Sequence, residues 1–497
     1  MCNNVSINIL SNEWSIDAFS EKEINYFYED RKFSSVLRGD YFLVLGRKGS
    51  GKSALFNKIL SMQSENLFAE SVTLTNMVPN ETDSDLRNPY AFWKYIIYVK
   101  IFKMLIRNQK VLIKNRQQLE ELFPEVQEFD TELYNWKLDS FLINIMDLLS
   151  FQFNRENKRR MKIEKKAELI EQITLNIFMS IKSDDENRRD NKIRRDDKSY
   201  YIVFDQLDIA YQTVQNLLAR DPYHEMILGL LRAANDIKKT AQKYELRIFP
   251  IIFMRDDIFN NLYFSDKSKF KEKSIRIVWD NESLKNLLSY RISCSSNQMG
   301  QDFKVAMRRI FDNNLIQEEV FKTILQMSHY RPRDIINYMK KCCDLAKDSN
   351  SDKVTFEIMK EAEIEYVNSL VGDLVDELFP IIPKFEQLKS LIGQLNTDFY
   401  FNEFKELFDH YQESFDFFLG RNAMEIINVL FDSCIIGIID YTNMVPIDRY
   451  KYMGDNIHID TRLPFTVHPG LRKYFYNFNY FYTESRHPYM CRYKPYF

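Results

Sequence analysis

Histidine and cysteine are scarce in this chain, and their placement excludes several kinds of site. The 497 residues include 6 histidines and 6 cysteines. The cysteines show no C-x-x-C spacing and no histidine partner at zinc-site distances, which predicts reduced structural thiols. The histidines are scattered, and no Ser-His-Asp or Cys-His set is visible. The sequence therefore predicts neither a zinc site nor a nucleophilic hydrolase.

Long apolar runs are also missing. The first residues, MCNNVSINILSNEW, lack the basic and then apolar design of a secretory signal. No uninterrupted apolar stretch approaches the roughly 18 residues of a membrane span. The net charge of −3 argues against a general coating of nucleic acid but leaves room for local basic patches. We therefore expect a soluble, cytoplasmic protein with no membrane partner.

Glycine is scarce too, but it is concentrated in one stretch. Of 12 glycines in the chain, three stand in GRKGSGKS, from Gly46 to Ser53. This stretch fits the phosphate-loop pattern G-x-x-x-x-G-K-[ST] at every fixed position. An apolar run, Tyr41 to Leu45, precedes it, and an amphipathic helical pattern opens at Ala54. The alternative, a plain glycine turn before a helix, is disfavoured by this strand–loop–helix context.

The phosphate loop predicts a nucleoside triphosphate and a magnesium ion. Its backbone N–H groups turn toward phosphate oxygens, Lys52 reaches the β- and γ-phosphates, and Ser53 offers its hydroxyl to Mg²⁺. No guanine-reading N-K-x-D stands in the expected place, which favours ATP. The predicted nucleotide-binding residues of the loop are Gly46, Arg47, Lys48, Gly49, Ser50, Gly51, Lys52, Ser53 and Ala54.

Further buried strands follow along the chain. Apolar, β-prone runs stand at Ser71–Met77, Ser199–Phe204, Arg247–Met254 and Ser274–Val278, and helical patterns separate them. The alternation of such strands with helices predicts an α/β fold with a parallel sheet.

Charged residues stand where two of these strands end. Asp205 closes SYYIVFD, the position at which a phosphate-loop enzyme needs a carboxylate to hold Mg²⁺, so we assign it to the metal with Ser53. Asp208 is the nearest candidate to orient or deprotonate the attacking water. Arg255 ends RIFPIIFMR and is placed to contact the γ-phosphate; a surface turn with a salt bridge is the alternative. Lys52, Asp205, Asp208 and Arg255 are the predicted catalytic residues.

A second arginine motif stands at Arg331-Pro332-Arg333, at the start of a helical pattern. Two arginines beside a proline present cations to an anion, and arginine suits bidentate phosphate contact, so all three residues are predicted at the nucleotide. A plain helix start is the alternative, because proline is comfortable in a first turn. Arg232 and Arg291 are weaker candidates for an arginine finger acting in a neighbouring subunit.

The chain divides into four predicted regions. Residues 1–40 form a lead-in, and 41–280 form the phosphate-loop core with a helical insert at about 90–198. Residues 281–370 form a helical lid, and 371–497 form a C-terminal domain with an aromatic tail.

Two of these regions suggest a nucleic-acid partner. In the C-terminal domain, helical patterns are followed by short strands at Ile435–Asp440 and Leu463–Val467, which favours a winged helix. In the insert, the basic run Lys158–Lys166 is able to contact phosphates, with a solvated helix face as the alternative. DNA is therefore a possible partner of this chain.

The motifs GRKGSGKSAL, YIVFDQLD, IIFMRDDIF and YRPRDIINYMKKC, in this order, resemble the bacterial P-loop ATPases related to STAND and origin-recognition AAA+ ATPases. Such proteins are often encoded among genes for defence against phages. The resemblance covers roughly residues 30–370 and implies an ASCE-type nucleotide domain, a helical lid and often a C-terminal winged helix. It implies that Arg255 matches a sensor-1 arginine and that Arg331-Pro332-Arg333 matches a sensor-2 motif. Gln206 departs from the family's frequent acidic residue, which implies slow hydrolysis.

These observations predict an ATP-binding and ATP-hydrolysing molecular switch in anti-phage defence. The switch would control an effector protein, an assembly of its own copies, or both. Two alternatives stay open from the sequence. One is a DNA-binding loader or initiator, suggested by the winged helix and the basic run. The other is a scaffold whose nucleotide is structural and never hydrolysed, suggested by Gln206.

Overall fold

The protein, seen in a computed structural model, forms two compact units. The sheet unit comprises Glu29–Lys48 and Lys52–Ile277, and the helical unit comprises Met1–Tyr28, Gly49–Gly51 and Val278–Phe497. The structure describes residues 4–17, 26–64, 66–73, 88–107, 162–186, 198–207, 220–296, 300, 302–379, 381–412, 414, 420–442, 446–454 and 457–476.

A five-stranded parallel sheet forms the centre of the sheet unit, in the order β2-β3-β4-β1-β5. Its strands are β1 (Leu43–Gly46), β2 (Leu67–Thr73), β3 (Ser199–Asp205), β4 (Ile248–Arg255) and β5 (Ser274–Arg276). The predicted α/β fold with a parallel sheet is thereby confirmed. Because β4 lies between β1 and β3, the strand that carries the phosphate loop and the strand that ends in Asp205 are not neighbours.

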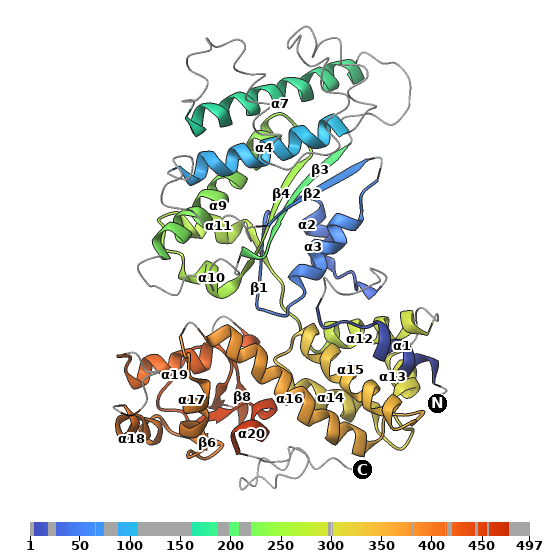
Figure 1. Ribbon diagram of the computed structural model, residues 1–497, viewed down its shortest axis with the longest axis vertical. Helices are drawn as coiled ribbons and strands as arrows, with labels where there is room; N and C mark the ends of the chain where they lie inside the picture. Colours follow the sequence, from blue (N-terminus) through green and yellow to red (C-terminus); the bar gives the residue numbers. More distant parts are fainter. Residues whose placement is uncertain are drawn as a thin grey trace. The chain divides into compact units, whose positions relative to one another are not determined.

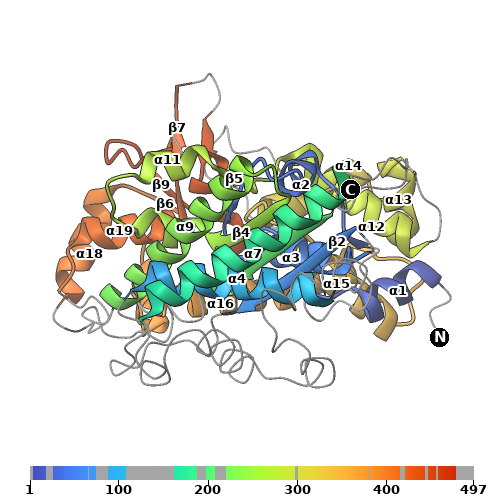
Figure 2. The same ribbon diagram turned by 90° about the horizontal axis from the view of Figure 1, so that it is seen from above.

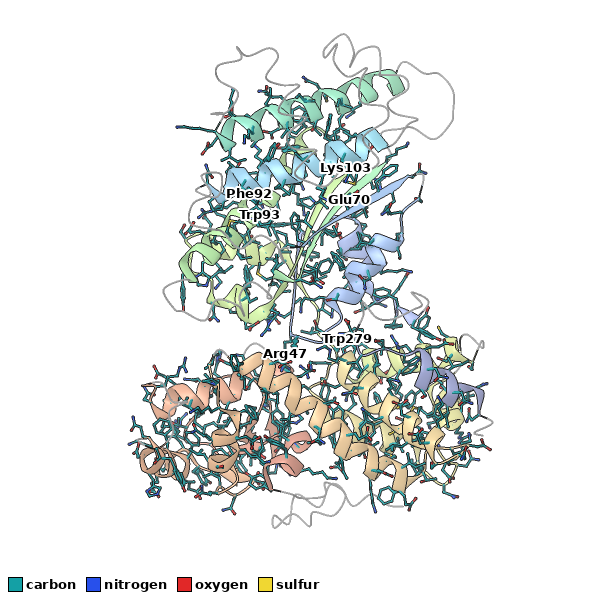
Figure 3. All side chains as sticks on the ribbon, viewed as in Figure 1. Arg47, Glu70, Phe92, Trp93, Lys103 and Trp279 are labelled. Carbon is teal, nitrogen blue, oxygen red and sulfur yellow. The ribbon has the colours of Figure 1, made fainter. Side chains whose placement is uncertain are left out.

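The sheet is buried on both faces, which explains its nearly continuous apolar strands. Phe204 lies in register with Ile252, so Phe204 and the next residue of β4, Phe253, point to opposite faces. Phe204 meets Trp93 with ring centroids 5.8 Å apart, and Phe253 meets Phe56 at 6.1 Å. Figure 3 labels Trp93 in this packing.

Helices cover the two faces. Helix α3 (Lys52–Ser61) packs on one face, while α4 (Pro89–Arg107) and α9 (Arg220–Lys243) pack on the other. Helix α7 (Ile163–Glu186) lies against α4, where Lys94 Nζ forms an ion pair of 2.7 Å with Glu171 (Figure 1 and Figure 2). The remaining helices of this unit are α2 (Arg31–Leu37), α10 (Asp256–Asn261) and α11 (Lys267–Glu272). The described part of the predicted insert is therefore helical.

One hydrophobic core runs through the helical unit. It joins residues of the N-terminal helix α1 (Val5–Glu13), such as Leu10, to residues as distant as Phe475. The helices that follow in this unit are α12 (Asn281–Ser295), α13 (Phe303–Ile310), α14 (Gln317–Met327), α15 (Pro332–Asp348) and α16 (Phe356–Leu378). Helix α1 packs on α15. The residues expected to form one lead-in, 1–40, are therefore divided: Met1–Tyr28 cluster with this unit, and the rest belong to the sheet unit.

The C-terminal part of the helical unit adds short helices and an antiparallel sheet in the order β6-β9-β7-β8. The chain order is α17 (Phe385–Ile392), β6 (Asp398–Phe399), α18 (Phe401–Tyr411), α19 (Ala423–Asp432), β7 (Ile436–Asp440), β8 (Ile447–Arg449), the 3-10 turn Lys451–Met453, β9 (Phe465–Val467) and α20 (Pro469–Tyr476). The two predicted strands correspond to β7 and β9. Strands β6 and β8 were missed, because two or three residues carry no readable alternation.

Two sequence expectations shift in the structure. The strand expected at Ser71–Met77 begins earlier, at Leu67, where β2 pairs with β3 opposite Ser199, and residues 74–77 of the expected strand lie outside the described residues. The boundary expected between residues 370 and 371 falls inside α16, and buried residues on either side of it, such as Leu370 and Leu374, share one core. Among the described residues, no helix is long and apolar enough to cross a membrane.

Two helical glycines give a matched test of packing. A Cβ at Gly229 of α9 would stand 2.6 Å from the backbone carbon of Pro89, whereas one at Gly372 of α16 would meet nothing within 4 Å. Glycine in a helix costs about 1 kcal/mol relative to alanine. We expect Gly372→Ala to raise the thermal unfolding midpoint and Gly229→Ala to lower it. A rise for Gly229→Ala would contradict the close approach of α4 and α9.

Candidate nucleotide-binding site

The phosphate loop joins the end of β1 at Gly46 to the start of α3 at Lys52. Gly49 and Gly51 have φ angles of 79° and 97°, in the left-handed region that favours glycine. A Cβ at Gly51 would meet nothing within 4 Å, so backbone conformation, not crowding, requires glycine there. The loop thus ends at the N-terminus of a ten-residue helix, where backbone N–H groups attract phosphate oxygens.

Lys52 is held within the loop that precedes it. Its Nζ donates to the carbonyl oxygens of Gly46 at 2.8 Å and of Arg47 at 2.9 Å. The side chain is 9% exposed. The ammonium group is therefore held beside the backbone of the loop, the part that surrounds the phosphates in a phosphate-loop enzyme.

Ser50 carries a polar atom that suits a phosphate oxygen. Its Oγ is buried and has no hydrogen-bond partner among the described residues. Its carbonyl oxygen accepts a hydrogen bond of 2.9 Å from the indole Nε1 of Trp279, which fixes the backbone (Figure 3). A buried hydroxyl without a partner costs free energy, and an incoming oxyanion would satisfy it. The loop therefore fits a phosphate group.

Asp205 is the last residue of β3 and is buried, at 5% exposed. Gln206 follows it with φ 60°, so the chain leaves the strand through a left-handed residue. Glutamine tolerates this conformation at a small cost in strain. Asp208, the predicted base, lies outside the described residues.

Arg255 ends β4 directly opposite the start of the loop, in register with Gly46. Its Nε and Nη2 donate to the two carboxylate oxygens of Asp257 at 3.0 Å and 2.6 Å. The arginine is buried, whereas the Asp257 side chain is half exposed. The salt bridge foreseen as an alternative thus exists, and it holds the guanidinium at the carboxyl end of β4.

Asp256 is a candidate that the sequence reasoning did not single out. Its Oδ1 accepts a hydrogen bond of 3.0 Å from Nε of Arg276, the last residue of β5. Burial raises the pKa of Asp256, against the lowering effects of Arg276 and Lys52. The charges of Asp256 and the loop lysine therefore attract each other. Only its place beside Asp257 at a strand end was visible in the sequence.

The second arginine motif lies in the helical unit, at the start of α15. Arg331 precedes the helix and is 3% exposed, and its Nε and Nη2 donate to Asp334 at 2.9 Å and 2.7 Å. Pro332 occupies the first turn. The N–H of Arg333 donates to the carbonyl oxygen of Gly49 at 3.4 Å, and its guanidinium pairs with Asp373. The side chains of both arginines stand beside Gly49, since a Cβ there would lie 3.1 Å from Arg333 Cβ and 3.5 Å from Arg331 Cδ.

The weaker arginine candidates have different surroundings. Arg291 is 5% exposed and stacks on the rings of Trp14 and Tyr26, so its guanidinium is inaccessible to another subunit. Arg232 is exposed on α9. The first part of the basic run, 158–161, lies outside the described residues, while Lys165 and Lys166 belong to α7.

The donor set suits magnesium. The described residues contain no group of three or more His, Cys, Asp or Glu side chains placed to hold a metal. Magnesium beside a phosphate loop needs no such group, because one carboxylate, one hydroxyl, phosphate oxygens and water complete its shell. Asp205 and the half-buried Ser53 are the residues that would hold it.

Comparisons with known proteins give limited matches. Residues 282–375 match the family described as the FunZ-associated C-terminal helical domain. The chain is 25% identical over 399 residues to a putative transposon gamma-delta 80.3 kDa protein of Escherichia coli (strain K12). That alignment covers 75% of this chain and 52% of the other, so the chain spans about half the length of its curated relative.

Three of the similar solved structures come from Pyrobaculum aerophilum and Aeropyrum pernix. Cdc6p of Pyrobaculum aerophilum is 12% identical, with a TM-score of 0.30 and coverage of 92% of this chain and 94% of the other. ORC1 of Aeropyrum pernix, solved with DNA, is 13% identical, with a TM-score of 0.35 and coverage of 84% and 86%. ORC2 of the same organism, solved as ADPNP–ADP complexes, is 12% identical, with a TM-score of 0.35 and coverage of 88% and 87%. At these TM-scores, the three structures assign no residue of the site.

Proposed function

We propose that this chain binds ATP with Mg²⁺ at the phosphate loop, hydrolyses it slowly, and acts as a molecular switch. The observation that carries the proposal is the loop itself. It follows a buried parallel strand, opens a helix, and holds the Lys52 ammonium against the carbonyls of Gly46 and Arg47. Loop glycines in the left-handed region leave the backbone N–H groups available to phosphate oxygens.

Each residue has a proposed task. Lys52 neutralises charge on the β- and γ-phosphates, and the backbone N–H groups of the loop orient them. Ser53 and Asp205 would hold Mg²⁺, which would supply positive charge against the negative charge of the phosphates. Arg255 lies in register with Gly46 and donates to Asp257. When ATP is bound, its guanidinium would leave Asp257 and donate to the γ-phosphate, so that its position depends on whether that phosphate is present.

Slow turnover follows from the residue after Asp205. A glutamine at position 206 orients a water molecule but is a poor base. Asp208 is the proposed base. Slow hydrolysis keeps ATP bound for a long time. A long-lived ATP-bound state suits a protein that controls an effector or an assembly better than one that couples rapid hydrolysis to movement. A role in defence against phages rests on the resemblance of the motifs alone.

Asp205→Asn tests the metal assignment. The change keeps the size of a buried side chain but removes its charge, so ATP binding should survive while Mg²⁺-dependent phosphate release falls at least about 100-fold. Gln206→Glu supplies a carboxylate at the adjacent position and should raise the rate above wild type. Phosphate release and binding of a fluorescent ATP analogue are measured for each variant. A wild-type rate of phosphate release by the Asp205→Asn variant would contradict the assignment of Asp205 to the metal.

DNA binding is a second candidate, favoured by the element order of the C-terminal part. Helix α17, strand β6, helices α18 and α19 and then strands form the sequence of elements of a winged helix. The exposed side chains of α19 are Glu425, Asn428 and Asp432, which include no cation. Such a face suits DNA phosphates poorly. Salt-insensitive or absent binding to duplex DNA would exclude this candidate.

The residues exposed on α18 and α19 favour a protein partner in place of DNA. Acidic side chains outnumber basic ones there, with Glu403, Glu406 and Asp409 on α18 against Lys405. We propose that the C-terminal part docks a basic surface of an effector or of another copy of the chain. Particle size with and without ATP tests the second of these.

A further inference from the structure

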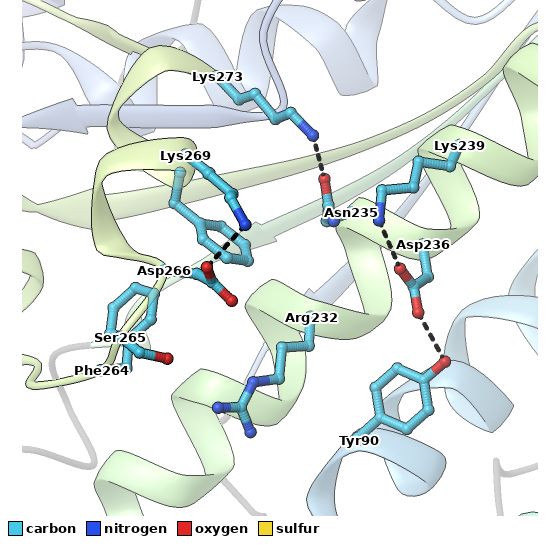
Figure 4. Close-up of a pocket in the computed structure, with 11 residues that line it drawn as sticks. Tyr90, Arg232, Asn235, Asp236, Lys239, Phe264, Ser265, Asp266, Lys269 and Lys273 are labelled. Atoms are coloured by element: carbon cyan, nitrogen blue, oxygen red, sulfur yellow. Dashed lines mark hydrogen bonds and ion pairs between the residues drawn. The ribbon is translucent and has the colours of Figure 1, made fainter.

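The sheet unit contains a second charged hollow, away from the phosphate loop. It has a volume of about 370 Å³, within the range of small-molecule sites. Helix α9 forms one wall, Tyr90 of α4 another, and the segment from Phe264 to Lys273 the third (Figure 4).

Cations exceed anions around this hollow. Four cationic side chains line it, Arg232, Lys239, Lys269 and Lys273, against two carboxylates, Asp236 and Asp266. The lining side chains therefore carry an excess of two positive charges. A phosphate monoester carries about −1.5 to −2 at neutral pH, which matches this excess.

Internal pairing occupies two of the lysines but not Arg232. Lys239 pairs with Asp236 at 3.3 Å, and Lys269 pairs with Asp266 at 2.8 Å. Arg232 makes no hydrogen bond or ion pair with the residues that the structure describes, and Figure 4 shows its guanidinium between Ser265 and Tyr90. It acts on Asp266 through its charge, which lowers the pKa of that carboxyl together with the larger effect of Lys269.

Lys273, the fourth cationic side chain of the hollow, has a neutral hydrogen-bond partner. Lys273 Nζ donates to the neutral amide oxygen of Asn235 at 2.7 Å. Burial lowers the pKa of the neighbouring Lys238, and the charge of Lys273 lowers it further. Positive charge therefore prevails among the side chains that line the hollow, and an anion would offset it.

The hollow lies at the end of the strands opposite to the phosphate loop. Lys273 immediately precedes β5, and Lys238 Nζ donates to the carbonyl oxygen of Asp40, ahead of β1. Both contacts stand at the amino ends of parallel strands, whereas Gly46 and Asp205 stand at carboxyl ends. A ligand here would not occupy the nucleotide site proposed above.

We propose that this hollow binds the phosphate group of a nucleotide, either free or within a nucleic-acid strand. Arg232 offers its planar fork to the phosphate oxygens, with Lys273 as the second cation. The half-buried ring of Phe264, held at 5.4 Å from Phe270, supplies an apolar wall for the organic part of the ligand.

Calorimetric titration tests the proposal in a Lys52→Ala background, which weakens binding at the phosphate loop. The probes are inorganic phosphate, AMP and a ten-residue oligothymidylate. Arg232→Gln should weaken the binding of at least one probe by about tenfold or more, because it removes a charge-assisted contact. Lys243→Gln removes the same charge from the same helix outside the hollow, and should change the affinity less than about twofold.

The probes separate the two sources of phosphate. Arg232-dependent binding of AMP identifies a free nucleotide, and tighter Arg232-dependent binding of the oligonucleotide identifies a nucleic-acid strand. Ser265→Glu, which adds a carboxylate to the hollow, should block either. Binding of no probe at millimolar concentration, or binding that Arg232→Gln and Ser265→Glu leave unchanged, overturns the proposal. Neither result bears on ATP binding by the wild-type loop.

Discussion

Lys52→Ala is expected to lower the affinity for ATP at least about 100-fold and to abolish hydrolysis. The Lys52 ammonium lies inside the loop, where it donates to the carbonyl oxygens of Gly46 and Arg47. In the nucleotide complex the same group would meet phosphate oxygens. Charge-assisted hydrogen bonds contribute about 1.5–3 kcal/mol each, and two of them account for a factor of about 100 or more.

Lys58→Ala provides the matched control for this variant. Lys58 stands on the same helix, α3, and its 3.4 Å ion pair with the largely exposed Glu29 is worth little. We expect its ATP affinity to equal that of the wild type. Fluorescence titration with an ATP analogue and phosphate release are the measurements. Equal losses in the two variants would show a general effect of charge on α3 and would contradict the assignment of Lys52.

The parts of the fold that sequence reasoning predicted are those with strong local signals. The runs before Gly46 and before Asp205 are apolar on both faces, and only a buried parallel strand needs that composition. The phosphate loop is a contiguous motif, so its place between β1 and α3 followed directly. The left-handed φ angles of Gly49 and Gly51 agree with the reason for choosing glycine there.

The missed features depend on residues that are distant in the chain. Asp256 meets Arg276 across 20 positions, and no local pattern marks the pair. The order β2-β3-β4-β1-β5 also depends on pairing between strands that the alternation of elements does not specify. The charged hollow around Arg232 joins α4, α9 and the segment before β5, which only the folded chain brings together.

The sequence identified the motif around Arg331 but not the partner of its side chain. The sequence placed two arginines around Pro332 and aimed both at a nucleotide. In the structure, Asp334 takes both donors of the Arg331 fork and also accepts the N–H of His329 at 2.8 Å. Arg331 and Asp334 are each 3% exposed, so the pair is a buried ion pair at the start of α15.

Asp334→Ala is therefore expected to cost about 3–5 kcal/mol of unfolding free energy, because it leaves a buried guanidinium without its partner. Lys341→Ala, on the same helix, breaks the partly exposed pair with Glu365 and should cost less than about 1 kcal/mol. Chemical denaturation followed by circular dichroism measures both. A loss below 1 kcal/mol for Asp334→Ala would mean that the pair is not buried in solution.

Replacing both partners separates the structural role of Arg331 from a nucleotide contact. In the double variant Arg331→Met with Asp334→Leu, no charge is left buried, so most of the lost stability should return. Because Asp334 already takes the Arg331 fork, we expect the ATP affinity of this variant to stay within about threefold of wild type. Arg333→Ala should lower it instead, because the change removes a cationic side chain whose Cδ would stand 3.2 Å from a Cβ at Gly49 of the loop. A stable double variant that no longer binds ATP would restore Arg331 to the nucleotide site and show that its pairing with Asp334 is exchanged on binding.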